Sequence, residues 1–353
     1  MRKVCLIRHG HPAFPLGAHV CLGRTDTPLG PLGRMQAVTL AEALRGESFD
    51  TVFSSPLVRC RETAAPLGKG PRLVDALAEQ DMGPWDGLDF SEIRARWPEL
   101  YARRASEPLL VPPGAEPLAE VQRRVIPALE RCVRESEGDI AVVAHASVIQ
   151  ALLADIERIP LEESRPLRPP YTGCVFLAWN GGFSPEVHSF SPCAPLTPTL
   201  AEKLLRAAAP GERVEAHCRA VAKEALRIAR ALPSTLDEKL LHAAALLHDA
   251  ARGEVQHAAC GAAWLRELGY GPAAALVERH HDWESGPLDE AAVLFLADKL
   301  IREDERVGLE ARFAESESRC TTAEARAAHA RRLKAARELK NRIDTACGYE
   351  VVV

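Results

Sequence analysis

A short apolar segment near the N-terminus leads directly into the tripeptide Arg8-His9-Gly10. The segment, Val4 to Ile7, predicts a strand, so the arginine and the histidine follow at its carboxyl end, the edge where open α/β sheets bind ligands. An arginine guanidinium grips phosphate oxygens through a fork of hydrogen bonds. An imidazole beside it is placed to attack phosphorus. The tripeptide therefore indicates phosphoryl chemistry.

A second group of reactive residues is spread along the other half of the chain. It comprises His217, His248, Asp249, His257, His280, His281 and Asp298. The two aspartates follow nearly all-apolar runs, which predicts helices and buried carboxylates. A buried carboxylate needs a partner or a metal ion, and imidazole with carboxylate is a ligand set for divalent first-row metals. The series therefore predicts a metal site.

The elements that carry the first group alternate in character. Strands are expected at 3–7, 51–54, 139–144, 173–179 and 186–190, and helices at 33–45, 57–65, 91–104, 116–135 and 147–156. Such alternation predicts an α/β three-layer sandwich with a mostly parallel sheet.

The character of the sequence changes after Pro192, Pro195 and Pro198, which indicate a linker at 192–200. From about residue 200 onward helical periodicity is continuous and no convincing strand follows. The second half is therefore expected to be all-α, with closing helices over 311–347. The expected division is a first domain at 1–191, the linker, and a helical domain at 201–353.

Composition excludes several classes of protein. The 353 residues carry a formal charge of only -5 and no basic stripe, which argues against a nucleic-acid partner. Ten cysteines without a C-x-x-C pair argue against a disulfide framework or a thiolate zinc site. No secretory signal and no membrane-spanning stretch is evident. The expectation is a reduced, cytoplasmic protein without a membrane partner, and a homodimer stays open.

Five motifs resemble, in order, those of the histidine phosphatase superfamily, which includes the phosphoglycerate mutases. They are Arg8-His9-Gly10, Gly23-Arg24-Thr25-Asp26, Ser55-Pro56-Leu57-Val58-Arg59, Gly83-Pro84-Trp85-Asp86-Gly87 and Val142-Val143-Ala144-His145. The resemblance covers about residues 1–190. Two departures are Phe14-Pro15, where the family often has an asparagine, and Ala146, where it usually has glycine.

The resemblance implies a role for each matching residue. His9 is the nucleophile that forms a phosphohistidine, His145 donates to the phosphoryl oxygens, and Glu79 protonates the leaving group. Asp81 and Asp86 stay open as alternative acids. The phosphate would be bound by Arg8, Arg59 and Arg24. No metal or other cofactor is expected in this domain.

The order H…HD…D over about residues 205–310 resembles the HD phosphohydrolase superfamily. The resemblance implies that His217, His248, Asp249 and Asp298 are the core metal ligands. His257, His280 and His281 resemble the added histidines of two-metal members. A binuclear divalent site is therefore expected, with Fe, Mn, Zn, Co or Ni. Arg252 would steady a phosphate.

Together these patterns predict a bifunctional phosphohydrolase that acts on a small phosphorylated metabolite or a nucleotide. The first domain would be a metal-independent phosphomonoesterase, and the second a metal-dependent hydrolase of a nucleotide-like phosphoester or anhydride. In the alternative, the HD domain is a non-catalytic sensor or scaffold, and the first domain is a phosphatase or a mutase. The complete ligand set with Arg252 favours catalysis, and the short 79–145 segment favours a phosphatase.

Overall fold

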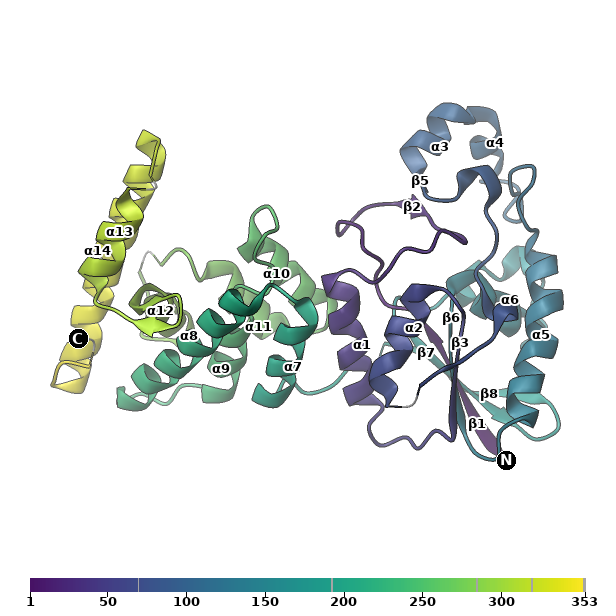
Figure 1. Ribbon diagram of the computed structural model, residues 1–353, viewed down its shortest axis with the longest axis horizontal. Coiled ribbons are helices and arrows are strands. Elements are labelled where there is room, and N and C mark those ends of the chain that lie inside the picture. Colours follow the sequence, from purple (N-terminus) through teal and green to yellow (C-terminus); the bar gives the residue numbers. More distant parts are fainter. Residues whose placement is uncertain (69, 192, 284, 319, 352–353) are drawn as a thin grey trace. The chain divides into compact units, whose positions relative to one another are not determined.

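The computed structural model describes residues 1–68, 70–191, 193–283, 285–318 and 320–351, apart from the side chains of 186–190 (Figure 1). The chain divides into two compact units, Met1–Ala194 and Pro195–Val353. The division falls inside the proline-rich segment 192–200. Each unit has its own elements and its own core.

The first unit is built on a six-stranded sheet with the order β4-β3-β6-β1-β7-β8. The strands are β1 Arg2–Arg8, β3 Thr51–Ser54, β4 Arg72–Leu73, β6 Ile140–Ala144, β7 Cys174–Trp179 and β8 Phe183–Phe190. Four of them, β4, β3, β6 and β1, run parallel, whereas β7 and β8 are antiparallel to their neighbours. The expected α/β class with a mostly parallel sheet is confirmed.

Helices cover both faces of this sheet (Figure 1). Alternate residues of β1 belong to different cores: Val4 and Leu6 to one, Cys5 and Ile7 to the other. Both faces are therefore buried, as is usual for a parallel sheet. The first core includes residues of α5 Leu118–Arg134 and α6 Ala146–Ile156, and the second includes residues of α1 Pro31–Ala43 and α2 Val58–Ala64.

Helix α1 lies very close to the loop that follows β1. A Cβ atom placed on Gly33 would be 2.0 Å from the carbonyl oxygen of His11, and one on Gly10 would be 2.7 Å from the carbonyl oxygen of Gly33. Only glycine permits this approach. The pair of glycines therefore seats the start of α1 against the loop that carries His9.

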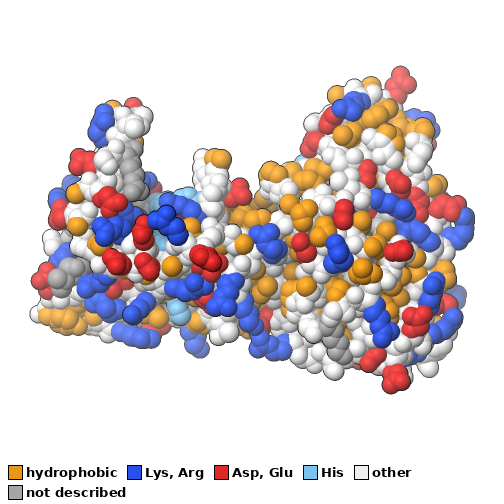
Figure 2. Space-filling view, viewed as in Figure 1, with side chains coloured by type: hydrophobic (Ala, Val, Ile, Leu, Met, Phe, Trp, Pro, Cys, Tyr) orange, Lys and Arg blue, Asp and Glu red, His pale blue; other side chains and the backbone are white. Residues whose placement is uncertain are grey.

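A small substructure that the sequence did not suggest joins the segment around Val20 to the segment after Gly83. Strands β2 Val20–Cys21 and β5 Leu88–Asp89 pair, and α3 Phe90–Arg96 and α4 Pro98–Arg103 follow. The single helix expected over 91–104 is wrong, because Pro98 disfavours a helical conformation at the residue before it. Hydrophobic side chains show at the surface over α3 and α4 in Figure 2.

The second unit is helical, as expected, with α12 at its centre. Its helices are α7 Pro198–Ala208, α8 Glu212–Ala231, α9 Glu238–Leu247, α10 His257–Glu267, α11 Gly271–Arg279, α12 Glu290–Leu300, α13 Leu309–Glu317 and α14 Ala323–Cys347. Every α12 residue from Ala291 to Leu300 is buried, because α8, α9, α11, α13 and α14 pack around it.

Two details of the second unit differ from expectation. A pair of two-residue strands, β9 Ile301–Arg302 and β10 Glu305–Arg306, interrupts the helices. Asp249 lies in a turn just beyond α9 rather than on a helix.

Short 3-10 turns occur in the first unit at Ala65–Leu67, Asp75–Leu77, Gly83–Trp85, Leu161–Glu163 and Arg165–Leu167. Within the described ranges, no helix combines the length and apolar character needed to cross a membrane.

Candidate functional sites

The first candidate site lies where β1 and β6 end side by side. The strands pair in parallel with Arg8 opposite Ala144, and the His9 amide donates to the Ala144 carbonyl oxygen at 3.0 Å. His9 and His145 therefore emerge at the same edge of the sheet. Their rings are buried, with centroids 5.1 Å apart.

The bonds around His9 fix which ring nitrogen is reactive. Nδ1 lies 2.8 Å from the Gly10 carbonyl oxygen. A carbonyl only accepts, so Nδ1 carries the proton and Nε2 keeps its lone pair. Burial and the charges of Arg59 and Arg8 lower the pKa of His9 well below its usual value. His9 is therefore a neutral imidazole at neutral pH, the form that attacks as a nucleophile.

His145 is also kept neutral, because burial, His9 and Arg59 lower its pKa well below the usual value. Its Nε2 lies 2.7 Å from the Ser55 hydroxyl oxygen.

Two guanidiniums beside His9 are held by carbonyl oxygens instead of carboxylates. Arg8 donates to Pro169 at 2.9 Å, and Arg59 donates to Thr25 at 2.9 Å and to Gly23 at 2.7 Å. The Nε atom of each is buried without a hydrogen-bond partner, and no carboxylate of the described residues lies within ion-pair distance of either. The chemistry of the pair fits an anion.

Asp86 positions Arg59 through the backbone. Its carboxylate accepts from the amides of Gly23, Arg24 and Thr25, at 2.7, 2.8 and 2.8 Å, and so shapes the loop whose carbonyls hold Arg59. Asp81 accepts from the Gly83 amide at 2.8 Å. Both aspartates that stayed open as acids thus bind backbone amides.

Glu79 contacts the start of α6, the helix that follows His145. It is 5 % exposed, and its carboxylate lies 2.9 Å from the amide of Gln80 and 3.5 Å from that of Ser147, in the first turn of α6. Arg24 lies at the rim instead. Its half-exposed side chain pairs with Glu116 at 3.5 Å and donates to the Glu79 carbonyl at 3.3 Å. The charge of Arg24 is thus already offset.

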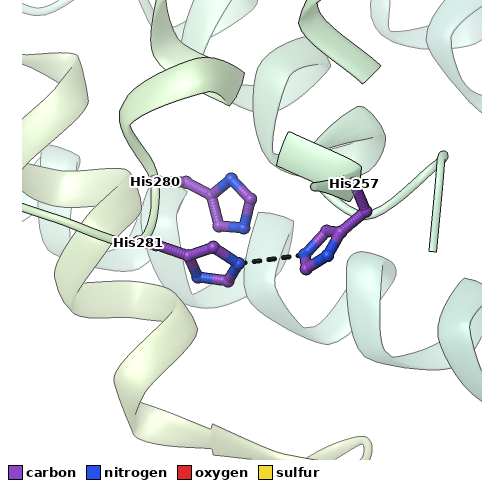
Figure 3. Close-up of side chains that lie close together, drawn as sticks. All are labelled: His257, His280 and His281. Carbon is purple, nitrogen blue, oxygen red and sulfur yellow. Dashed lines mark hydrogen bonds between the residues drawn. The ribbon is translucent and has the colours of Figure 1, made fainter. Parts of the chain in front are cut away.

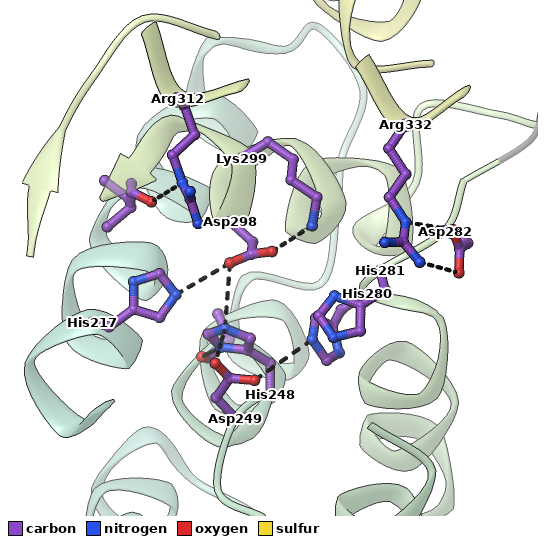
Figure 4. Close-up of polar contacts among 12 residues, drawn as sticks. His217, His248, Asp249, His280, His281, Asp282, Asp298, Lys299, Arg312 and Arg332 are labelled. Carbon is purple, nitrogen blue, oxygen red and sulfur yellow. Dashed lines mark hydrogen bonds and ion pairs between the residues drawn. The ribbon is translucent and has the colours of Figure 1, made fainter. Parts of the chain in front are cut away.

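The second candidate site gathers all seven predicted ligands, of which Figure 4 labels all but His257. His217 comes from α8, Asp298 from α12 and His257 from the start of α10. The neighbours His248 and Asp249 follow the end of α9, and the neighbours His280 and His281 follow the end of α11. Asp298 lies 3.1 Å from His217 Nε2 and 3.6 Å from His248 Nε2. The structure therefore brings together residues that are more than 80 positions apart.

The ligands form two groups that meet at Asp249. His217, His248 and Asp249 make one group, and His257, His280 and His281 make the other (Figure 3). The nearest ligand atoms of each group lie within 4.8 Å of one another. Asp249 Oδ1 is 3.1 Å from His257 Nε2, and its Oδ2 is 3.8 Å from His248 Nε2. A carboxylate with one oxygen towards each group suits a pair of ions.

Three of the histidines are anchored through Nδ1 to backbone carbonyls. His217 bonds to Glu303 at 2.8 Å, His248 to Ala245 at 2.7 Å and His280 to Val277 at 2.6 Å. In each, Nδ1 therefore donates, which leaves Nε2 as the ring atom that faces the carboxylates or the other imidazoles. The Nε2 atoms of His248 and His280 are buried without a hydrogen-bond partner. Metal-binding histidines are oriented in this way, so the residues fit divalent metal ions.

The carboxylates of this site are ionised. Burial would raise the pKa of Asp298, but Lys299 and two histidines lower it well below the usual value. Burial likewise opposes ionisation of Asp249, whose pKa is lowered by His257, His248 and Arg252. Ionised carboxylates are the form that binds metal.

Most of the imidazoles whose pKa is shifted are neutral. Burial lowers the pKa of His280 to about 2 and that of His281 to about 4. Burial alone would lower the pKa of His248, but Cys218 and the two carboxylates raise it well above the usual value. That ring therefore lies where a positive charge is favoured, and a metal ion would supply one.

Two cations flank the carboxylates. Arg252, about half exposed, lies 3.2 Å from Asp249 Oδ2. Lys299 is buried and lies 2.5 Å from Asp298 Oδ2. Sequence reasoning missed Lys299, although a lysine directly after Asp298 in an apolar helix was a usable signal. Asp282 pairs with Arg332 at 2.9 Å, outside the groups (Figure 4).

Comparison with known families matches residues 4–190 to the histidine phosphatase superfamily (branch 1). The chain belongs to the histidine phosphatase superfamily. An HD domain matches residues 214–303, so the fused architecture expected from the motifs is confirmed. This histidine phosphatase is a hydrolase acting on phosphate esters. HD domains are generally metal-dependent, and the described part of the chain contains two candidate metal-binding groups.

Relatives with different substrates resemble the first unit. A glucosyl-3-phosphoglycerate phosphatase of Mycobacterium tuberculosis is 31 % identical over 45 % of this chain and 77 % of the relative. Phosphoserine phosphatase 1 of Hydrogenobacter thermophilus is 32 % identical over 46 % of this chain and 80 % of the relative. The solved structure of mycobacterial hydrolase 2 has a TM-score of 0.51 and 27 % identity, and covers 59 % of this chain and 97 % of its own.

Proposed function

We propose that this histidine phosphatase hydrolyses a small phosphomonoester through a phosphohistidine, and that its HD unit is a second, metal-dependent phosphohydrolase. The observation that carries the first part is the pair of guanidiniums, each with a buried and unpartnered Nε, beside a neutral histidine. Arg8 and Arg59 have no carboxylate partner among the described residues. A phosphate ester, with about two negative charges, is the ligand that such a pair fits.

In the proposed reaction, His9 Nε2 attacks phosphorus while the bond to the leaving oxygen breaks. Arg8 and Arg59 hold the phosphoryl oxygens, and His145 donates a hydrogen bond to one of them. Glu79 gives its proton to the leaving alkoxide, and the alcohol departs. Glu79 then takes a proton from water, which attacks the phosphohistidine and releases phosphate. The cations of the chain supply the charge, so this half of the proposal needs no metal.

In the HD unit, His217, His248, Asp249 and Asp298 would hold one ion. Asp249, His257, His280 and His281 would hold a second. Bound divalent ions activate water and polarise a phosphoryl oxygen. The nitrogen-rich ligand set favours Fe, Mn, Zn, Co or Ni over calcium. Arg252 binds a substrate phosphate, and Lys299 keeps the Asp298 carboxylate ionised and oriented.

The substrates are proposed at the level of class. Two relatives are named for glucosyl-3-phosphoglycerate and for phosphoserine, which are small phosphorylated metabolites. We propose a substrate of that kind for the first unit and a nucleotide-like phosphoester or anhydride for the second.

Phosphate release by the full chain tests both parts. Sugar, nucleotide and cofactor phosphates are assayed with EDTA or with each candidate metal, in the wild type, His9→Ala and Asp249→Asn. We expect EDTA-resistant turnover that His9→Ala removes, and metal-dependent turnover that Asp249→Asn removes. EDTA-resistant turnover that survives His9→Ala contradicts the phosphohistidine. Metal binding without metal-dependent turnover assigns the HD unit to the sensor or scaffold class.

A further inference from the structure

Arg168 is a guanidinium at the first site that neither the motifs nor the mechanism uses. It lies between α6 and β7, in the segment whose Pro169 carbonyl binds Arg8 and whose Tyr171 ring lies 4.0 Å from the Arg8 guanidinium. Its Nε donates to Gln150 Oε1 at 2.5 Å, and its Nη2 donates to Ser147 Oγ at 3.4 Å. The side chain is therefore fastened to the first turns of α6.

The anchor of Arg168 is itself firm, because Gln150 is buried and donates to the Ser164 hydroxyl at 2.7 Å. Within the described ranges, no carboxylate lies at ion-pair distance from Arg168. Arg168 as a whole residue is exposed to solvent. Its guanidinium is nevertheless surrounded by enough protein that burial lowers its pKa. Two of its five N–H donors have partners in the protein. The others are available to a ligand.

Ser147 links Arg168 to Glu79, the proposed proton donor to the leaving group. The Ser147 amide lies 3.5 Å from Glu79 Oε2, while the Ser147 hydroxyl accepts from Arg168. Glu79, as the proposed acid, marks the position of the leaving oxygen. Arg168 thus lies beside the leaving group, whereas Arg8 and Arg59 lie beside the nucleophile.

We propose that Arg168 binds a second anionic group, located on the alcohol part of the substrate. This inference rests on the proposed function of the first unit. A guanidinium forks onto a carboxylate or a phosphate, so the substrate class is a phosphorylated hydroxy acid or a bisphosphate. Because Arg168 and Glu79 contact the same serine, the second anion lies within a few atoms of the ester oxygen.

Matched esters test this specificity in the full chain with EDTA present. 3-Phosphoglycerate and glycerol 3-phosphate differ only in a carboxylate against a hydroxymethyl group. Fructose 1,6-bisphosphate and fructose 6-phosphate differ in a second phosphate, and 4-nitrophenyl phosphate has no second anion. We expect the wild type to favour one anion-bearing member, and Arg168→Gln to lower kcat/KM for it by roughly 10- to 100-fold, mainly through KM.

Control variants separate recognition from damage to the fold. Arg168→Gln is expected to change turnover of 4-nitrophenyl phosphate by less than about two-fold, since that ester does not reach the guanidinium. Arg168→Lys keeps the charge without the fork and restores part of the loss. Arg165→Gln removes an exposed charge from the same segment and should match the wild type.

Two outcomes overturn the inference: a wild type that does not distinguish the matched esters, or an equal loss in Arg168→Gln on all esters. Binding of the same esters to His9→Ala, measured by calorimetry, gives a readout without turnover. If His9→Ala binds the anion-bearing esters more tightly, and the preference depends on Arg168, the inference is supported without any turnover. Failure of His9-dependent turnover on every ester contradicts the proposed reaction separately.

Discussion

The two sites of this chain present opposite charges. At the sheet edge of the first unit, Arg8 and Arg59 are cations held by carbonyl oxygens. In the HD unit, Asp249 and Asp298 are anions among histidines whose Nε2 atoms face them. One site therefore fits an anion and the other fits a cation. The same problem, the negative charge of a phosphate, is met in one unit by guanidiniums of the chain and, we infer, in the other by bound metal.

The largest expected effect is the loss of one activity without the other when the proposed nucleophile is replaced. His9→Ala should lower EDTA-resistant phosphatase activity by roughly a thousand-fold or more and abolish an acid-labile phosphoenzyme, because no other group supplies the covalent step. Metal content and metal-dependent turnover should not change. Labelling with a ³²P ester measures the phosphoenzyme. The exposed His19→Ala is the control, and a His9→Ala protein that still labels would show that the nucleophile is elsewhere.

The reciprocal change is made at Asp249. Asp249→Asn should weaken metal binding by more than about 100-fold, since even residues that merely orient metal ligands contribute about 10- to 100-fold. The melting temperature of the HD unit should fall when metal is present, by linkage. Elemental analysis and calorimetry measure both. Asp282→Asn, which removes a carboxylate paired with Arg332, should keep its metal. Lost phosphatase activity in Asp249→Asn would break the independence of the two sites.

The proton donor gives a smaller and more selective effect. Glu79→Gln should slow release of an alkyl alcohol by about 100-fold but that of 4-nitrophenol only a few-fold, because a good leaving group needs little proton donation. Steady-state kcat on the two esters measures the difference. Equal slowing of both would mean that Glu79 positions substrate instead of protonating it.

The smallest effect concerns pH. A free histidine with a pKa of 6.5 would be about 90 % protonated at pH 5.5. Because burial, Arg59 and Arg8 lower the pKa of His9 well below that value, the ring should still be neutral there. Phosphoenzyme formation with an aryl phosphate, followed by rapid quench, should change less than about two-fold between pH 7 and 5.5. A ten-fold fall would show that His9 titrates like a free histidine.

The sequence identified more of the residues that meet at the two candidate sites than of the residues that support them. His9, His145 and the seven HD residues follow apolar runs or stand in motifs, so they could be recognised from the local sequence and its order. The role of Asp86 depends on three amides about 60 positions away, which no local pattern reveals. Arg168 stands in a proline-rich loop with no periodicity, and its anchors on α6 appear only after folding.

Local backbone chemistry explains the other differences. The break between α3 and α4 comes from Pro98, which the helical pattern of 91–104 concealed. The pairs β2–β5 and β9–β10 are only two residues long, too short to show an alternation. Asp249 continues an apolar helical run, yet α9 ends at Leu247, so the carboxylate is carried by a turn.

The contact between Gly33 and the loop after β1 has a consequence for how this protein tolerates change. Since a Cβ on Gly33 would lie 2.0 Å from the His11 carbonyl oxygen, any other residue there must push the loop or the helix aside. Displacements of about 1 Å at a reacting centre cost on the order of 100-fold in rate. We therefore expect a substitution at this position, which has no side chain, to be tolerated as poorly as one at a residue that touches the substrate.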